Sequence, residues 1–219
     1  LARDVLASVT DSDVSNEAFP YLSTLELRVG PAPVFAQRIS WVGELGWELW
    51  VEPRWAVAAW DRLMDAGRPH GLKPCGYQVL EGLRSERGYR AFGSDLTAGD
   101  TPDEAGLSFC VDASKDFVGR RAILAAREVS PERSLRTLLV GDRRELQIYG
   151  GEAVHLDGRV VGRVRSSAFG FTVGRTIAFA YLPADLGDGT MGVEVFGDVV
   201  AAEVAADVLL DPQGKRVRS

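Results

Sequence analysis

The chain has 219 residues, of which 46% are hydrophobic and 26% are charged, and these proportions exclude disordered, collagen-like and coiled-coil proteins. Acidic residues outnumber Lys and Arg by 31 to 25, so the formal net charge is −6, which disfavours binding to nucleic-acid phosphates. The longest apolar runs, 55–60 and 177–182, are far shorter than the roughly 18 residues of a membrane helix. We therefore predict a soluble protein without a nucleic-acid or membrane partner.

The first elements along the chain indicate a mixed α+β region. Residues 1–6 resemble the interior of a helix, and no initiator Met or signal peptide precedes them, so we expect a piece of a longer, cytoplasmic protein. Alternating apolar residues predict strands at 25–29, 34–41 and 47–51, with tight turns between them. Apolar residues at helical spacing predict helices that open at Pro53 and Pro74, the second ending at Gly88. A short amphipathic helix is predicted at 119–127.

The pattern changes near residue 130. From 135 to 210, short strands alternate with glycine turns, which predicts a small antiparallel barrel or sandwich. The segment 199–210 is rich in Ala and Val and fits a helix about as well as a strand. We therefore predict an α+β fold in two domains, an antiparallel sheet with helices at 1–130 and an all-β barrel, jelly-roll-like, at 131–219.

Several patterns typical of catalytic or metal sites are weak or missing. Cys75 and Cys110 are too few for a disulfide framework and lack zinc-ligand spacing, and two histidines, His70 and His155, nearly exclude an imidazole metal site. Residues 187–192 match the GxGxxG string of dinucleotide-binding proteins, but an alternating strand follows where that motif needs a helix. We interpret this string as a hairpin turn, and we predict no metal.

Two long strings and several shorter ones carry a family resemblance. The strings are RISWVGELGWEL at 38–49 and LRSERGYRAFGSDL at 83–96, and further pieces at 15–20, 100–107, 116–120, 181–183, 189–190 and 211–212 agree in order. Together they resemble the tetrahydrofolate-binding aminomethyltransferase family, whose type member is the T-protein of the glycine cleavage system. The RGYRAFGSDLT wording at 87–97 looks closer to the C-terminal folate domains of dimethylglycine and sarcosine dehydrogenases.

The resemblance implies a three-lobed fold with tetrahydrofolate in a central opening, of which this chain supplies the middle and C-terminal lobes. The family's catalytic aspartate lies in the first lobe, upstream of this chain, so we expect no catalytic residue here. The implied activity is transfer of a one-carbon unit from a small amine to tetrahydrofolate, with a flavoprotein domain or an aminomethyl carrier protein as a further partner. Two alternatives stay open: a non-catalytic folate-binding module that works with a separate flavoprotein, and a folate-dependent demethylase acting on a sulfonium compound.

The resemblance assigns the family's pterin-binding glutamate to Glu48. A pterin presents its N3–H and 2-amino donors side by side, and one carboxylate can accept both. On the predicted strand, Glu48 shares a face with Trp50 and Glu52, whereas Leu49 and its neighbours share the other face. The alternative interpretation is a solvated strand residue.

Two further positions follow from the same resemblance. The family's arginine in its LR-x-E helix corresponds to Arg84, whose planar donor fork suits a folate carbonyl or carboxylate. A structural salt bridge to Glu81 or Glu86 is the alternative for Arg84. Trp41 stands where relatives often carry tyrosine, and its flat ring suits packing against the pterin or benzoyl group.

Overall fold

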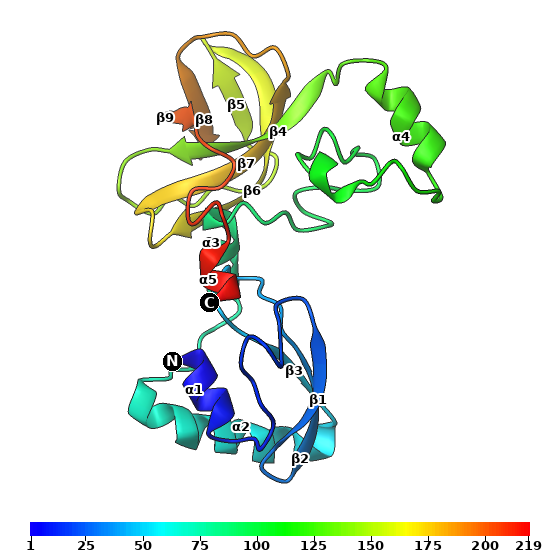
Figure 1. The fold of residues 1–219 in the computed structure, drawn as a ribbon. Helices are drawn as coiled ribbons and strands as arrows, with labels where there is room; N and C mark the ends of the chain where they lie inside the picture. The colour runs from blue at the N-terminus through cyan, green and yellow to red at the C-terminus, as the bar shows by residue number, and fades with distance from the viewer. The chain divides into compact units, whose positions relative to one another are not determined.

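The computed structural model describes all 219 residues (Figure 1). The chain forms two compact units, and each is described by itself below. Unit 1 consists of Leu1–Leu80 with Asp211–Ser219, and unit 2 consists of Glu81–Leu210. The predicted domain boundary near residue 130 falls between the last helix and the first strand of unit 2, and it stays a prediction.

Unit 1 is built on a three-stranded antiparallel sheet in the order β1-β2-β3. Its strands are β1 (Thr24–Val29), β2 (Ala32–Gln37) and β3 (Glu48–Val51), and its helices are α1 (Ala2–Ala7), α2 (Pro53–Gly67), the 3-10 turn η1 (Arg68–His70) and α5 (Lys215–Arg218). Inward-facing residues of β1 and β2 pack with α1 and α2 to form the core, so one face of the sheet is buried. The alternation that predicted the strands is therefore the alternation between core and solvent.

Between β2 and β3 the structure differs from the prediction. The second strand ends at Gln37 instead of residue 41, and a longer loop at 38–47 replaces the tight turn. Strand β2 ends at Gln37, where its register with Thr24 on β1 and Glu48 on β3 also ends. The backbone of Arg38 still exchanges hydrogen bonds with Leu22 and Ser23, and its buried guanidinium donates to the carbonyl oxygen of Phe19 at 2.7 Å. The loop then turns at Gly43, which has a positive φ of 77°, and Ser40 Oγ accepts the backbone N–H of Glu44 at 3.2 Å.

Unit 2 contains a closed six-stranded barrel in the order β4-β7-β6-β5-β8-β9, with every pair of neighbours antiparallel. The strands are β4 (Arg133–Val140), β5 (Ala153–Leu156), β6 (Arg159–Gly170), β7 (Arg175–Pro183), β8 (Met191–Val195) and β9 (Asp198–Val204). Valines, leucines and alanines from all the strands fill its interior. The predicted α+β class with a small barrel is confirmed. The segment with ambiguous composition forms β9 as far as Val204.

The remaining helical elements are α3 (Gln78–Glu86), the 3-10 turn η2 (Ser108–Cys110) and α4 (Arg120–Arg127). Helix α3 begins at Gln78, later than the predicted opening at Pro74. It ends as predicted, because Gly88 adopts a positive φ of 64° and Tyr89 N–H returns to the carbonyl of Arg84 at 3.0 Å. None of the helices has both the length and the apolar character needed to cross a membrane.

The glycine string at 187–192 is not a nucleotide-binding loop. It runs into strand β8, which begins at Met191, instead of a helix, as the sequence indicated. The hairpin interpretation is wrong in one respect, because β8 pairs with β5 and β9 and not with the preceding strand β7. The string is therefore a crossing connection within the barrel.

Candidate functional site

Glu48 opens strand β3 on the solvent face of the sheet in unit 1. Glu48 and Trp50 are exposed, whereas Leu49 and Val51 pack against the core, so the predicted division of faces is confirmed. Glu48 lies opposite Gln37 on β2, and Gln37 Oε1 accepts the indole N–H of Trp50 at 2.7 Å. The Glu48 carboxylate itself makes no ion pair or hydrogen bond within the chain. Its two oxygens can therefore accept donors from a ligand.

Trp41 lies in the loop at 38–47, ahead of β3, and its side chain is 38% exposed. This loop is held to the C-terminal segment of unit 1 by an ion pair between Glu44 and Arg216 at 2.6 Å. Glu48 and Trp41 are thus parts of the same unit, seven positions apart. Their roles toward a pterin stay predictions.

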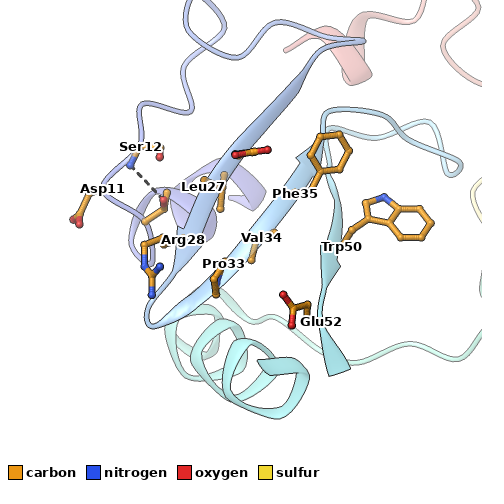
Figure 2. A pocket seen from close by; sticks show the side chains of 11 residues that line it. Asp11, Ser12, Leu27, Arg28, Pro33, Val34, Phe35, Trp50 and Glu52 are labelled. Carbon is orange, nitrogen blue, oxygen red and sulfur yellow. Dashed lines mark hydrogen bonds between the residues drawn. The ribbon is translucent and has the colours of Figure 1, made fainter. Parts of the chain in front are cut away.

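A cavity of about 620 Å³ lies on the same solvent face of the sheet (Figure 2). The strand register places Glu26, Phe35 and Trp50 in one row across β1, β2 and β3. Phe35 and Trp50 are exposed, and the carboxylate of Glu52 also lines the cavity. Glu52 was predicted to share the face of Glu48, but the cavity was not predicted, because the row depends on strand register, which alternation alone does not give. Glu48 does not line this cavity.

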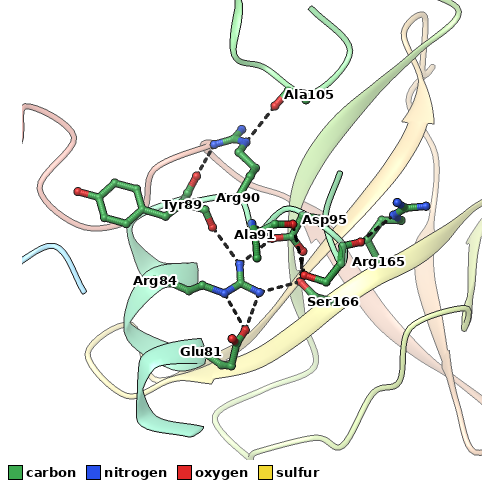
Figure 3. Close-up of polar contacts among 11 residues, drawn as sticks. Glu81, Arg84, Tyr89, Arg90, Ala91, Asp95, Ala105, Arg165 and Ser166 are labelled. Atoms are coloured by element: carbon green, nitrogen blue, oxygen red, sulfur yellow. Dashed lines mark hydrogen bonds and ion pairs between the residues drawn. The ribbon is translucent and has the colours of Figure 1, made fainter. Parts of the chain in front are cut away.

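Arg84 lies on α3 in unit 2, where it is 1% exposed and at the centre of a polar network (Figure 3). Its Nε donates to Glu81 at 2.7 Å, and one Nη1 donor reaches Asp95 at 2.7 Å. The other Nη1 donor reaches the carbonyl of Tyr89 at 2.9 Å, and Nη2 contacts Glu81 at 2.6 Å and Ser166 Oγ at 3.3 Å. All five N–H donors of the guanidinium therefore have partners.

The network distinguishes the two salt-bridge partners that the sequence suggested. The ion pair to Glu81 is present, whereas Glu86 faces another way and its carboxylate accepts the backbone N–H groups of Thr172 and Val173. Asp95, fully buried, is a partner that sequence reasoning missed, although it stands inside the string at 83–96. Because Arg84 belongs to unit 2, it lies in a different unit from Glu48 and Trp41, and its role toward folate stays a prediction.

Comparison with a solved structure identifies the class of fold. The crystal structure of glycine cleavage system aminomethyltransferase T from Bartonella henselae matches with a TM-score of 0.81 at 24% identity. The match covers 96% of this chain and 57% of that one. An α+β unit followed by a closed barrel is thus the arrangement of elements that the two chains share.

Sequence comparisons identify the family. The family described as "GCVT N-terminal domain" matches residues 1–115, and "Glycine cleavage T-protein C-terminal barrel domain" matches residues 133–211. Mitochondrial sarcosine dehydrogenase of Mus musculus is 40% identical over 99% of this chain and 25% of its own length. An aminomethyltransferase of Streptomyces coelicolor is 38% identical over 97% of this chain and 57% of its own length. The chain belongs to the glycine cleavage T-protein family, and it spans about a quarter of the dehydrogenase.

Proposed function

We propose that this chain is the tetrahydrofolate-binding part of a protein that transfers a one-carbon unit from an amine to tetrahydrofolate. The similarity to an aminomethyltransferase and to mitochondrial sarcosine dehydrogenase supports a chemistry in which a carbon bonded to an amine nitrogen is passed on. The role assigned to this chain in that transfer is to bind and orient the folate.

The observation that carries the proposal is the unpaired carboxylate of Glu48 on the solvent face of β3. A carboxylate accepts the N3–H and the 2-amino group of a pterin through two parallel hydrogen bonds, which fix the ring plane as well as contributing affinity. Trp41, on the loop that leads into β3, offers a flat ring for packing on the pterin or benzoyl group. Arg84 in unit 2 offers a cationic anchor for the benzoylglutamate end.

Tetrahydrofolate, when bound, supplies the nitrogen nucleophiles N5 and N10 that receive the one-carbon unit. The task of this chain is to hold the pterin in one orientation, so that these nitrogens face the incoming carbon. Glu48 does so only in its ionised form, because a protonated carboxyl would place its own donor against a pterin donor.

The proposal is tested by replacing Glu48 with Gln and titrating the chain calorimetrically with 5-formyltetrahydrofolate. The amide of E48Q presents N–H₂ to at least one pterin donor, so we expect the affinity to fall about 10- to 100-fold, the range for hydrogen bonds to a charged group. The control is E26Q, which removes a carboxylate from the same exposed sheet face on β1 and leaves the affinity unchanged. Equal affinities for E48Q and the wild-type chain would refute the role of Glu48.

A second candidate is a folate-holding module without chemistry of its own. The similarity to only a quarter of sarcosine dehydrogenase favours it, since such a module would receive its one-carbon unit from a flavoprotein elsewhere. The two candidates differ in the turnover of the complete protein that carries this chain. The first predicts that this protein alone transfers a one-carbon unit from an amine to tetrahydrofolate, whereas the module predicts folate binding without formation of 5,10-methylenetetrahydrofolate from sarcosine until a separate sarcosine-oxidising flavoprotein is added.

A further inference from the structure

The partners of Arg84 fall into two groups that differ in burial. Asp95 is fully buried, and it also accepts the backbone N–H of Ala91 at 2.8 Å and a hydrogen bond from Ser166 Oγ. Glu81, by contrast, is 39% exposed, so it covers the guanidinium from the solvent side. Asp95 is therefore a fixed partner of Arg84, and Glu81 is the partner that can leave.

The contact between Glu81 and Arg84 is also geometrically incomplete. Both contacts use a single oxygen, Oε2, which faces Nε at 2.7 Å and Nη2 at 2.6 Å. The second oxygen of Glu81 takes no part in the pair. A guanidinium binds a carboxylate best through two parallel N–H···O bonds to two oxygens. An incoming carboxylate with free orientation can form that arrangement on the edge that Glu81 now occupies with one oxygen.

We propose that Glu81 is an internal competitor for the anchoring edge of Arg84, and that a carboxylate of the ligand binds this edge by displacing it. This inference rests on the proposed function, in which Arg84 anchors the benzoylglutamate end of folate. The guanidinium keeps Asp95 throughout, so its charge is never left unpaired during the exchange. Glu81 moves into solvent, where its own charge is hydrated.

Because one carboxylate replaces another, the net gain in binding free energy is small. The ligand must first break a partly exposed ion pair, a contact of the class worth at most about 1 kcal/mol. Replacing Glu81 removes this free-energy cost from ligand binding, which corresponds to about a fivefold gain in affinity. Only ligands that carry the carboxylate end benefit.

The test compares two half-ligands on the full 219-residue chain by calorimetric titration. p-Aminobenzoylglutamate carries the carboxylates without the pterin, and 6-methyltetrahydropterin carries the pterin without the carboxylates. We expect E81A to bind p-aminobenzoylglutamate about fivefold more tightly than the wild-type chain, with an intermediate gain for E81Q, whose amide oxygen is a weaker acceptor. The affinity for 6-methyltetrahydropterin stays unchanged in both variants.

A matched control separates competition from a general charge effect. E203A removes another partly exposed carboxylate that pairs with an arginine, Glu203 with Arg175 at 3.2 Å, from the same unit. Its affinity for p-aminobenzoylglutamate stays at the wild-type value, and a gain equal to that of E81A would overturn the inference. An unchanged or weaker affinity of E81A, in a chain whose circular dichroism spectrum is native, would also overturn it.

If the wild-type chain bound neither half-ligand nor 5-formyltetrahydrofolate, the proposed function would fail as well. If the wild-type chain binds 5-formyltetrahydrofolate and E48Q weakens this binding, but E81A does not bind p-aminobenzoylglutamate more tightly, only the competitor role of Glu81 would be overturned.

Discussion

At the scale of single residues, unit 2 holds several charged groups away from solvent by pairing them. Arg84 and Asp95 form a buried pair at 2.7 Å, with side chains that are 1% and 0% exposed. Each also has polar partners that satisfy its remaining donors or acceptors. Such a network tolerates the loss of a rim partner such as Glu81, but not the loss of its buried carboxylate.

Replacing Asp95 with Asn tests this difference. D95N keeps the size of the side chain but leaves the Arg84 charge buried with Glu81 as its one remaining carboxylate. We expect the free energy of unfolding to fall by about 3 kcal/mol, the lower end for a broken buried pair. D142N, which removes an exposed carboxylate from the ion pair with Arg144, should leave the free energy of unfolding nearly unchanged. Urea unfolding measures both, and similar stabilities for the two variants would contradict the assignment.

Tyr181 on β7 is a second buried group with an electrostatic consequence. Its side chain is 7% exposed, and its hydroxyl oxygen has no hydrogen-bond partner. Burial raises the pKa of the Tyr181 hydroxyl from its ordinary value of 10.0 to about 12. Because the unfolded chain loses this proton first, the neutral phenol stabilises the fold fully below pH 10, and this contribution is lost as the pH rises towards 12.

Replacing Tyr181 with Phe separates this effect from the other titrating groups. At pH 7, Y181F should unfold at the same or a slightly higher urea concentration, because an unpaired buried hydroxyl is removed. Between pH 10 and 12 the wild-type chain should lose stability more steeply than the variant. Parallel pH profiles for the two chains would show that Tyr181 ionises as readily in the folded state as in the unfolded one.

At the scale of elements, the close approach of strands β6 and β7 in the barrel depends on the absence of a side chain at Gly162. A Cβ added there would lie 2.3 Å from the backbone carbonyl oxygen of Tyr181 and 2.7 Å from a methyl group of Leu182. The backbone oxygen belongs to a central strand and cannot move without disturbing its ladder. Gly162 is therefore required by the packing of β6 on β7.

The variant G162A should lower the free energy of unfolding by about 2 kcal/mol, within the range for overpacking. G187A is its control, because a Cβ at that loop position meets no atom within 4 Å and its φ is not positive. Thermal unfolding of the two variants compares them directly. A drop in Tm for G187A as large as that for G162A would contradict the steric explanation.

The elements also show which parts of the fold the sequence could predict. Strand β1, helix α2 and the end of α3 at Gly88 agree with the patterns, since alternation, helical spacing and glycine chemistry are local signals. The early end of β2 was not predictable, because it falls where the register with Thr24 on β1 and Glu48 on β3 ends, and alternation alone does not give strand register. The pairing of β8 with β5 was not predictable either, since alternation does not specify a partner strand.

At the scale of the whole molecule, the candidate site was predicted only through the family strings. Periodicity placed Glu48 on a solvent face, but the same pattern fits any solvated strand residue. Asp95 was within the quoted string and yet unidentified as a partner of Arg84, and Ser166 lies 82 positions from Arg84 in a barrel strand. Contacts over such separations are set by tertiary structure and leave no local signal.

The chain spans about a quarter of the dehydrogenase and more than half of the aminomethyltransferase with which it was compared. A part that is shared by proteins of such different lengths is consistent with one common task, and we propose that this task is to bind folate. Binding should also stabilise the chain, since a ligand that binds only the folded state raises Tm by an amount that grows with the logarithm of 1 + [L]/Kd. A rise in Tm with 5-formyltetrahydrofolate that E48Q reduces and E26Q retains would support this assignment. Equal rises for both variants would contradict it.

The most direct test of Glu48 as the pterin-binding residue is a crystal structure of the chain with 5-formyltetrahydrofolate bound. We expect the pterin N3 and 2-amino nitrogen each to lie within about 3 Å of one Glu48 carboxylate oxygen, the normal N–H···O distance. A pterin bound elsewhere, with the Glu48 carboxylate facing solvent, would contradict it.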